Sequence, residues 1–189
     1  MRRFSVKPAI TLHGRQFKGV RGFAGKPFHP PLTDFPVAAY TLGAVFDVGS
    51  VIGGDNHTWS RELWHAATFV IIGGAIVSVL AALTGWFDWL RSTNQGTQAR
   101  RTVNTHAWIM ITVTVLTIVN IILRLNSYHT DRSTPVGIML LSIVVAALVS
   151  WGATYGGTLV FDYGFNVETA GDSPVWHESE VDVLPGDRH

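Results

Sequence analysis

Four long apolar stretches constrain this chain more than any other feature of its sequence. They lie near residues 34–53, 63–85, 105–125 and 135–156. Each has about the 20 residues that an α-helix needs to cross a hydrocarbon core of ~30 Å. Only 14% of the residues are charged, against about 25% in an average soluble protein. The sequence therefore predicts an all-α integral membrane protein, a four-helix transmembrane bundle.

Charge is distributed unevenly along the chain, although the net charge is only +1. Residues 1–30 contain seven Lys or Arg and no acid, residues 31–157 are balanced, and residues 158–189 contain seven acids and one Arg. The pattern predicts a basic extension at 1–30, a transmembrane domain at 31–157 and an acidic tail at 158–189. With four spans, both tails and the basic segment around 91–102 share one side. The positive-inside rule then places both termini in the cytoplasm.

The third apolar stretch carries a polar stripe. Steps of three or four residues place the following side chains on one helix face: His106, Met110, Val113, Thr117, Asn120 and Arg124. Because charge in lipid is costly, we expect this face to point into the bundle. Asp47 in the first stretch lies at the depth of Arg124, and we predict a buried ion pair that fixes helix register. A role for the pair in a proton path or beside a cofactor is the alternative.

Two further patterns concern packing and the membrane interface. Small residues recur every four positions in the second and fourth stretches, which is typical of closely packed helix faces: Gly74, Ser78 and Ala82, then Ser142, Ala146, Ser150 and Thr154. Trp59, Trp64 and Tyr128 are expected in an aromatic belt at the outer interface.

Histidine is the only plentiful metal-ligand type, because the chain has eight histidines and no cysteine. His29 precedes the first apolar stretch and His106 begins the third, so both lie at the cytoplasmic edge. A haem between helices takes axial imidazoles from two of them, so this pair is the first candidate for haem b ligands. His65 and His129, at the outer edge, are second candidates. The competing interpretation is that these histidines bond to lipid headgroups or to a partner.

Several motifs occur together along the chain. They are His29-Pro30 followed by Phe35-Pro36, then Gly85-Trp86-Phe87-Asp88, His106, Arg124 and Tyr155-Gly156-Gly157. In these motifs, over roughly residues 29–165, the chain resembles a bacterial membrane family named domain of unknown function 2231. The resemblance implies a small four-helix protein of the bacterial inner membrane. Family members fused to Rieske-type iron–sulfur domains imply a role in membrane redox chemistry. The family often has a second histidine where this chain has Asp34, which leaves His29 and His106 as the ligand set.

We therefore expect an accessory integral-membrane subunit of a larger respiratory or redox complex, stabilising it through helix packing and through its two tails. Its expected partners are other membrane-protein subunits and the lipid bilayer, with no nucleic acid. The alternative is an electron-transfer subunit with haem b on His29 and His106; otherwise no cofactor is expected. No nucleophile beside a base and no carboxylate-rich metal cluster is recognisable, so we expect no catalysis by the chain alone.

Overall fold

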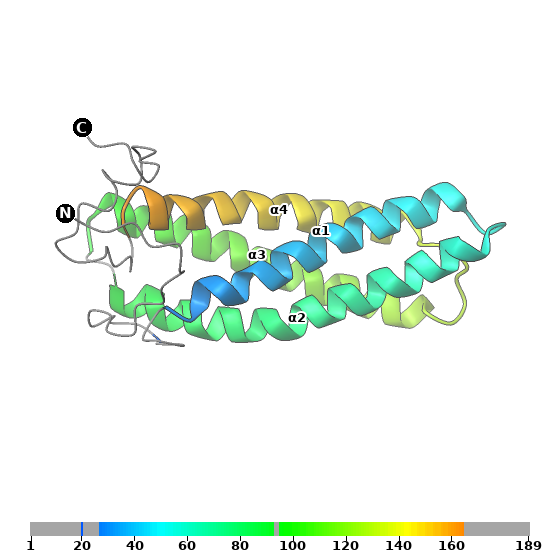
Figure 1. The fold of residues 1–189 in the computed structure, drawn as a ribbon, viewed down its shortest axis with the longest axis horizontal. Helices are drawn as coiled ribbons and strands as arrows, with labels where there is room; N and C mark the ends of the chain where they lie inside the picture. The colour runs from blue at the N-terminus through cyan, green and yellow to red at the C-terminus, as the bar shows by residue number, and fades with distance from the viewer. Residues whose placement is uncertain (1–19, 21–26, 93–94, 165–189) are drawn as a thin grey trace, which may run out of the picture.

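The computed structural model describes residue 20, residues 27–92 and residues 95–164. Four α-helices occupy this part of the chain: α1 His29–Gly53, α2 Thr58–Ser92, α3 Gln98–Ser127 and α4 Val136–Phe161. They lie side by side along one direction (Figure 1). Each is long and apolar enough to cross a membrane, which confirms the predicted four-helix transmembrane class. Most of the basic extension and acidic tail, and with them their expected docking on a partner, lies outside the described residues.

Local sequence signals explain where the helices begin and end. Pro30 lies in the first turn of α1, where a missing backbone N–H leaves no helical bond unmade. Gly54 ends α1 at a φ of +60°, and its N–H donates to the carbonyl of Ser50. The hydroxyl of Thr97 accepts from an N–H in the first turn of α3, as an N-cap residue does. The helices extend to His29 and Phe161, a few residues beyond either side of the domain expected at 31–157.

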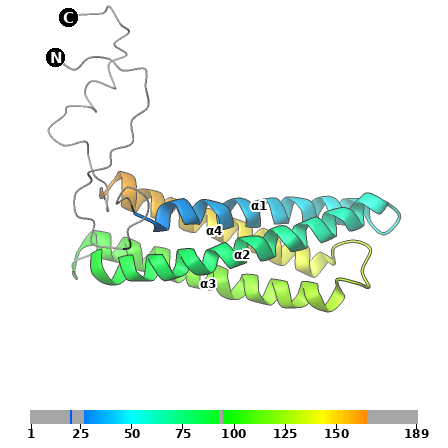
Figure 2. The same ribbon diagram turned by 60° about the horizontal axis from the view of Figure 1, so that its bottom comes forward.

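The helices form two antiparallel hairpins, α1–α2 and α3–α4, whose turns lie at the same end of the bundle (Figure 2). The most extensive contacts are within the hairpins, and α1–α4 and α2–α3 contacts close the ring. Helices α1 and α3 are therefore diagonal to each other and meet only through side chains across the core. The centre of the core is an apolar cluster of Tyr40, Ile71, Val113, Val145 and Val149.

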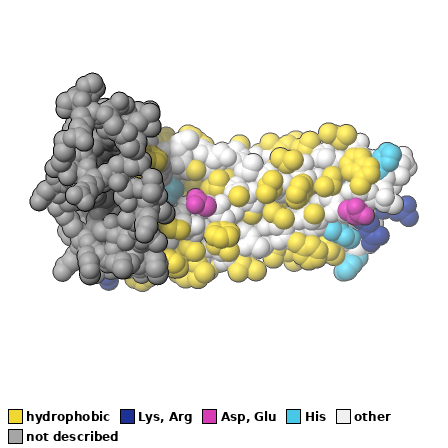
Figure 3. All heavy atoms as spheres, in the orientation of Figure 1, with side chains coloured by type: hydrophobic (Ala, Val, Ile, Leu, Met, Phe, Trp, Pro, Cys, Tyr) yellow, Lys and Arg dark blue, Asp and Glu magenta, His cyan; other side chains and the backbone are white. Residues whose placement is uncertain are grey.

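The outer surface is apolar along most of its length. Hydrophobic side chains cover most of the visible face, histidine and basic side chains gather mainly at the end opposite the residues drawn in grey, and acidic side chains are seen toward both ends (Figure 3). Trp59 is 42% exposed there, as an interfacial residue should be, but Trp64 is 0% exposed. The prediction that Trp64 belongs to the outer belt is wrong, because its ring packs in the core under the Arg124 guanidinium.

The small-residue stripes also depart from expectation. Gly74 and Ser142 are buried, but Ala82, Ser150 and Thr154 are exposed. A step of four residues turns a helix by about 400°, so a stripe at that spacing drifts about 40° per step around the helix. The buried face of α4 instead alternates steps of four and three: Ile138, Ser142, Val145, Val149 and Gly152. A strict four-residue spacing therefore predicted only the first part of each packing face.

Candidate functional site

His29 begins α1 and its side chain crosses to α2. Its Nδ1 atom lies 2.8 Å from the backbone oxygen of Ala81, and the hydroxyl of Thr84 lies 3.4 Å from the same nitrogen. Gly85 lies one turn further along α2, where a Cβ atom would be only 2.6 Å from Cε1 of the imidazole. The missing side chain of Gly85 therefore makes room for the ring of His29.

His106 lies on α3 and its side chain crosses to α4 in the same manner. Its Nδ1 atom lies 2.9 Å from the backbone oxygen of Gly152. Gly156 lies one turn further along α4, and a Cβ there would be 3.4 Å from Cε1 of this second imidazole. Each histidine is thus held by a carbonyl of a neighbouring helix and lies against a glycine of that helix.

The two imidazoles meet across the core. Their ring centroids are 6.5 Å apart and their planes are nearly perpendicular, at 83°. A carbonyl oxygen can only accept a hydrogen bond, so each Nδ1 carries the proton and donates it. In the neutral form, each ring then keeps an unprotonated Nε2 atom. Neither Nε2 atom has a hydrogen-bond partner in the described part of the chain.

This arrangement suits a ligand that needs two imidazole nitrogens and nothing else from the protein. Among the described residues, no group of three or more His, Asp or Glu side chains could hold a metal ion by itself. A metalloporphyrin supplies four nitrogens of its own, so two axial histidines complete its coordination. Metal-bound histidines commonly donate their other ring N–H to a backbone carbonyl, as both of these do.

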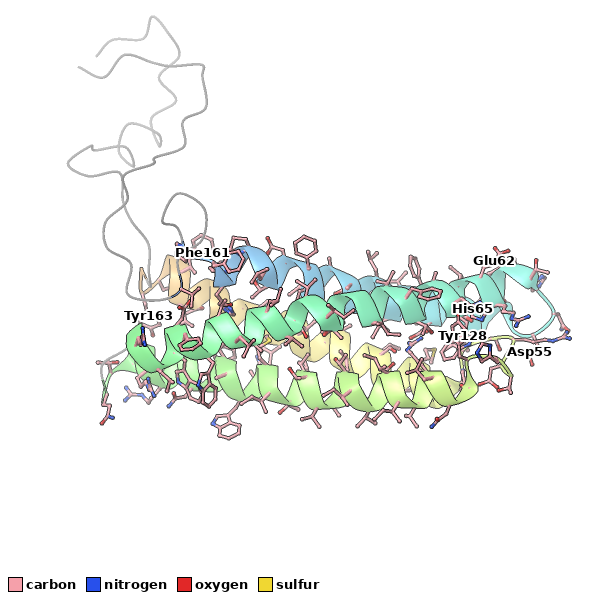
Figure 4. All side chains as sticks on the ribbon, turned by 90° about the horizontal axis from the view of Figure 1, so that it is seen from below. Asp55, Glu62, His65, Tyr128, Phe161 and Tyr163 are labelled. Carbon is pink, nitrogen blue, oxygen red and sulfur yellow. The ribbon has the colours of Figure 1, made fainter. Side chains whose placement is uncertain are left out.

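His65 and His129, the second candidates, are arranged differently. The ring of His65 stacks on Tyr128 at a centroid distance of 4.4 Å, and both lie near the turns of the hairpins (Figure 4). Its Nε2 atom lies 3.3 Å from the Tyr128 carbonyl. His129 contacts the edge of the same tyrosine ring. The structure therefore places Tyr128 in contact with both histidines and does not pair them ring to ring.

Arg124 and Asp47 lie together in a fully buried ion pair near the same turns. The Arg124 guanidinium donates to several side chains of the bundle: the carboxylate of Asp47, the amide oxygen of Asn120 at 2.5 Å, the hydroxyl of Ser142 at 3.0 Å and that of Thr68 at 3.3 Å. Its remaining surface lies 4.9 Å from the Trp64 ring centroid, a cation–π contact.

The partners of Asp47 complete this cluster. Its second carboxylate oxygen accepts from the Thr134 hydroxyl at 3.0 Å, and the Thr134 N–H donates to Ser50 at 2.9 Å. All four helices and the α3–α4 turn therefore contribute to one hydrogen-bonded unit. Because its two charges are paired and hydrogen-bonded within the protein, the unit is suited to fixing helix positions. Beside it, Nε1 of Trp64 and Oγ of Ser60 are buried without a hydrogen-bond partner in the described part of the chain.

Sequence reasoning did not identify several residues of these two sites. The Ala81 and Gly152 carbonyls have no sequence signal, because every residue has a carbonyl. Gly85 and Gly156 were visible within motifs, but their contacts depend on how separate helices pack. Trp64 and Thr68 lie four residues apart on α2 and could have been identified as one buried face.

The fold and the sites define a polytopic membrane protein with an internal histidine pair and a separate buried ion pair. Comparison with known families identifies it further: the sequence matches the family described as predicted membrane protein DUF2231 over residues 25–169. The chain belongs to this family. No curated protein and no solved structure matches it.

Proposed function

We propose that this protein is a subunit of a respiratory or other redox complex in the bacterial inner membrane, and that it holds one b-type haem between His29 and His106. The observation that carries this proposal is the pair of imidazoles 6.5 Å apart, each with an Nε2 atom free of hydrogen bonds in the described chain. The basic segment around 91–102 supports a cytoplasmic position for both termini and for the histidine end of the bundle.

The distance between the two rings fits the binding of one metal ion by both imidazoles. An ion that bonds one nitrogen of each ring at about 2 Å, the usual metal–imidazole distance, spaces the centroids about 6 Å apart. His29 and His106 would hold the haem iron. The carbonyls of Ala81 and Gly152 would hold the rings in one tautomer and orientation.

When bound, a haem supplies one-electron redox chemistry. The chain's contribution is to hold Nδ1 of each ring on a helix carbonyl, which leaves Nε2 as the nitrogen that can bind a ligand. The site lies at the first turn of α1, close to one end of the bundle. An electron-transfer partner would therefore dock at the end where α1 begins.

An absorption spectrum tests the proposal. The full chain, purified in detergent from haem-replete cells, should show narrow reduced-minus-oxidised bands of a low-spin b-type cytochrome. His106→Ala should abolish these bands, and His129→Ala, an exposed histidine at the opposite end, should retain them. Colourless wild-type protein, or bands that survive His106→Ala, would contradict haem ligation by this pair.

A second candidate is a cofactor-free accessory subunit, and a groove between α1 and α4 favours it. The groove has a volume of about 450 Å³ and is lined by Thr41, Ala44, Val45, Val48, Ile143, Ala146, Ala147 and Ser150. The hydroxyls of Thr41 and Ser150 bond to carbonyls of their own helices. The surface left to a partner is thus apolar and lined by small residues, which allow a neighbouring helix to approach closely.

Filling this groove tests the accessory role. Ala147→Trp should release the protein from its complex on a native gel without unfolding it. Val119→Trp, on the exposed face of α3, is the matched control and should leave migration unchanged. Equal migration of both variants with the wild-type complex would count against the groove as a subunit contact.

A further inference from the structure

The two hairpins repeat each other's contacts at a constant spacing. Residues of α1 correspond to residues of α3 that lie 77 positions later, as the ion pair of Asp47 and Arg124 does. His29 and His106 have the same spacing. Both pairs therefore join equivalent positions of two helices that face each other diagonally across the core.

The two halves of the histidine site use the same kinds of contact, although a glycine Cβ would lie closer to His29, at 2.6 Å, than to His106, at 3.4 Å. His29 bonds to the carbonyl of Ala81 and lies against Gly85, four residues later. His106 bonds to the carbonyl of Gly152 and lies against Gly156, again four residues later. Ala81 and Gly152 are 71 positions apart in the sequence, and so are Gly85 and Gly156. One histidine, one carbonyl and one glycine thus recur at corresponding positions of the two hairpins.

The same spacings hold in the middle of the core. A Cβ at Gly43 would lie 2.5 Å from Ile71, and the equivalent residues Asn120 and Ser142 are joined by a 2.9 Å hydrogen bond. Tyr40 and Thr117, which are also 77 positions apart, line one small void together. Equivalent positions therefore meet along the length of the bundle.

Burial follows the same equivalence. Five buried positions of α2, namely Ala67, Ile71, Gly74, Ala81 and Asp88, correspond to five buried positions of α4, namely Ile138, Ser142, Val145, Gly152 and Leu159. The helix contacts agree, because α1 packs on α2 and α4 as α3 packs on α4 and α2. Both hairpin turns also lie at one end (Figure 2).

We infer that α1–α2 and α3–α4 are two copies of one helical hairpin, related by a pseudo-two-fold axis along the bundle, and that the histidine site lies on this axis. Gly85 and Gly156 are then equivalent positioning residues, one for each imidazole. A ligand on the axis must present the same chemistry to both copies, as the two axial faces of a metalloporphyrin do. The choice of ligand rests on the proposed function, but the equivalence of the hairpins does not.

The pseudo-two-fold axis also explains why Asp47 and Arg124, at the other end of the bundle, carry opposite charges. Two identical acidic or basic residues at positions 47 and 124 would repel each other in a medium of low dielectric constant. Opposite charges at these positions remove that repulsion. Neutral imidazoles can meet on the axis without such a change, so the histidine pair keeps the same residue in both copies.

Glycine substitutions in the full chain test the equivalence. Histidine carrying ¹⁵N should show Nδ1-protonated rings for both His29 and His106, assigned with His→Gln variants. Gly85→Ala should displace the His29 signals alone, because its Cβ would lie 2.6 Å from that ring. A Cβ at Gly156 would only touch His106 at 3.4 Å, so the bulkier Gly156→Val is the variant that should displace the His106 signals alone. Gly73→Ala on α2 and Gly137→Val on α4 are the matched controls, since a Cβ at either position meets nothing within 4 Å. If both glycine variants match these controls, or if each disturbs both histidines equally, the inference is wrong.

Haem content provides a separate readout. In haem-loaded protein, each of Gly85→Ala and Gly156→Val should lower haem affinity by about 10- to 100-fold, the usual effect when a ligand loses the hydrogen bond that orients it. If the imidazole signals respond as expected and no haem binds the wild type, the proposed function fails and the equivalence stands. If the signals do not respond but haem binds, the equivalence fails and the proposed function stands.

An exchange across the axis keeps the inference testable if a glycine variant does not fold. Tyr40→Thr alone should open a cavity and Thr117→Tyr alone should overpack the core. The double variant places the same two side chains on the opposite copies, so its melting temperature should exceed that of both single variants. A double variant less stable than either single variant would overturn the two-fold relation.

Discussion

At both ends of the bundle, a polar residue of α1 meets one of α3 diagonally across the core, but the two pairs differ in how their hydrogen-bonding groups are satisfied. At one end, Arg124 donates to four side chains and Asp47 accepts from two residues, so the charged groups are satisfied within the protein. At the other end, each histidine uses Nδ1 and keeps an Nε2 lone pair. The comparison shows that buried polar groups of similar placement can serve different roles. A satisfied cluster is suited to fixing the fold, whereas the unused lone pairs are what the proposed ligand would bind.

The largest expected effect is at the satisfied end. Arg124→Gln leaves the Asp47 carboxylate buried without its counter-charge, which should lower the free energy of unfolding by about 3–5 kcal/mol. Denaturant unfolding in detergent, followed by circular dichroism, measures this change. Asp47→Asn should have a similar effect, and the double variant should lose less than the sum because the two side chains act together. A loss below about 1 kcal/mol in either single variant would contradict a structural role for the pair.

A serine in the same cluster should have an intermediate effect. Ser142→Ala removes the oxygen that accepts from both Asn120 and Arg124, so it should cost about 1–3 kcal/mol. Ser150→Ala, an exposed serine on the same helix, is the control and should change stability by less than about 0.5 kcal/mol. Equal melting temperatures for these two variants would show that the cluster is less tightly coupled than its geometry indicates.

The smallest expected change in stability is at the histidine end. His106→Gln in haem-free protein removes one hydrogen bond to the Gly152 carbonyl, which should cost about 1 kcal/mol. The same substitution should abolish the haem bands completely. A loss of several kcal/mol in haem-free protein would indicate that this end also serves mainly to hold the fold together.

The sequence was sufficient for the four spans, because each is a long apolar run, and for the inward face of α3. His106, Thr117, Asn120 and Arg124 were placed on one face by mixed steps of three and four residues, and the last three are buried. The faces of α2 and α4 were less well predicted, since a strict spacing of four drifts around a helix.

The contacts of the two sites needed the structure. The depth of Asp47 and Arg124 could be estimated from the sequence, but the presence of Trp64, Thr68 and Thr134 around them depends on how three separate segments pack. The histidines could be assigned to one end of the bundle. Their separation, and the carbonyls that orient them, follow from the close approach of α1 to α2 and of α3 to α4.

The buried ion pair also bears on how the chain enters the membrane. Asp47 is synthesised 77 residues before Arg124, so α1 reaches the bilayer first with an acidic side chain. An unpaired charge costs about 2.5–3.5 kcal/mol at the centre of an inserting helix and less toward its ends, where Asp47 lies. Helix α3, which is synthesised later, carries the compensating positive charge of Arg124, with Asn120 on the same face. Insertion of α3 should therefore be easier when α1 is already in place, and the order of synthesis becomes part of what makes the bundle assemble.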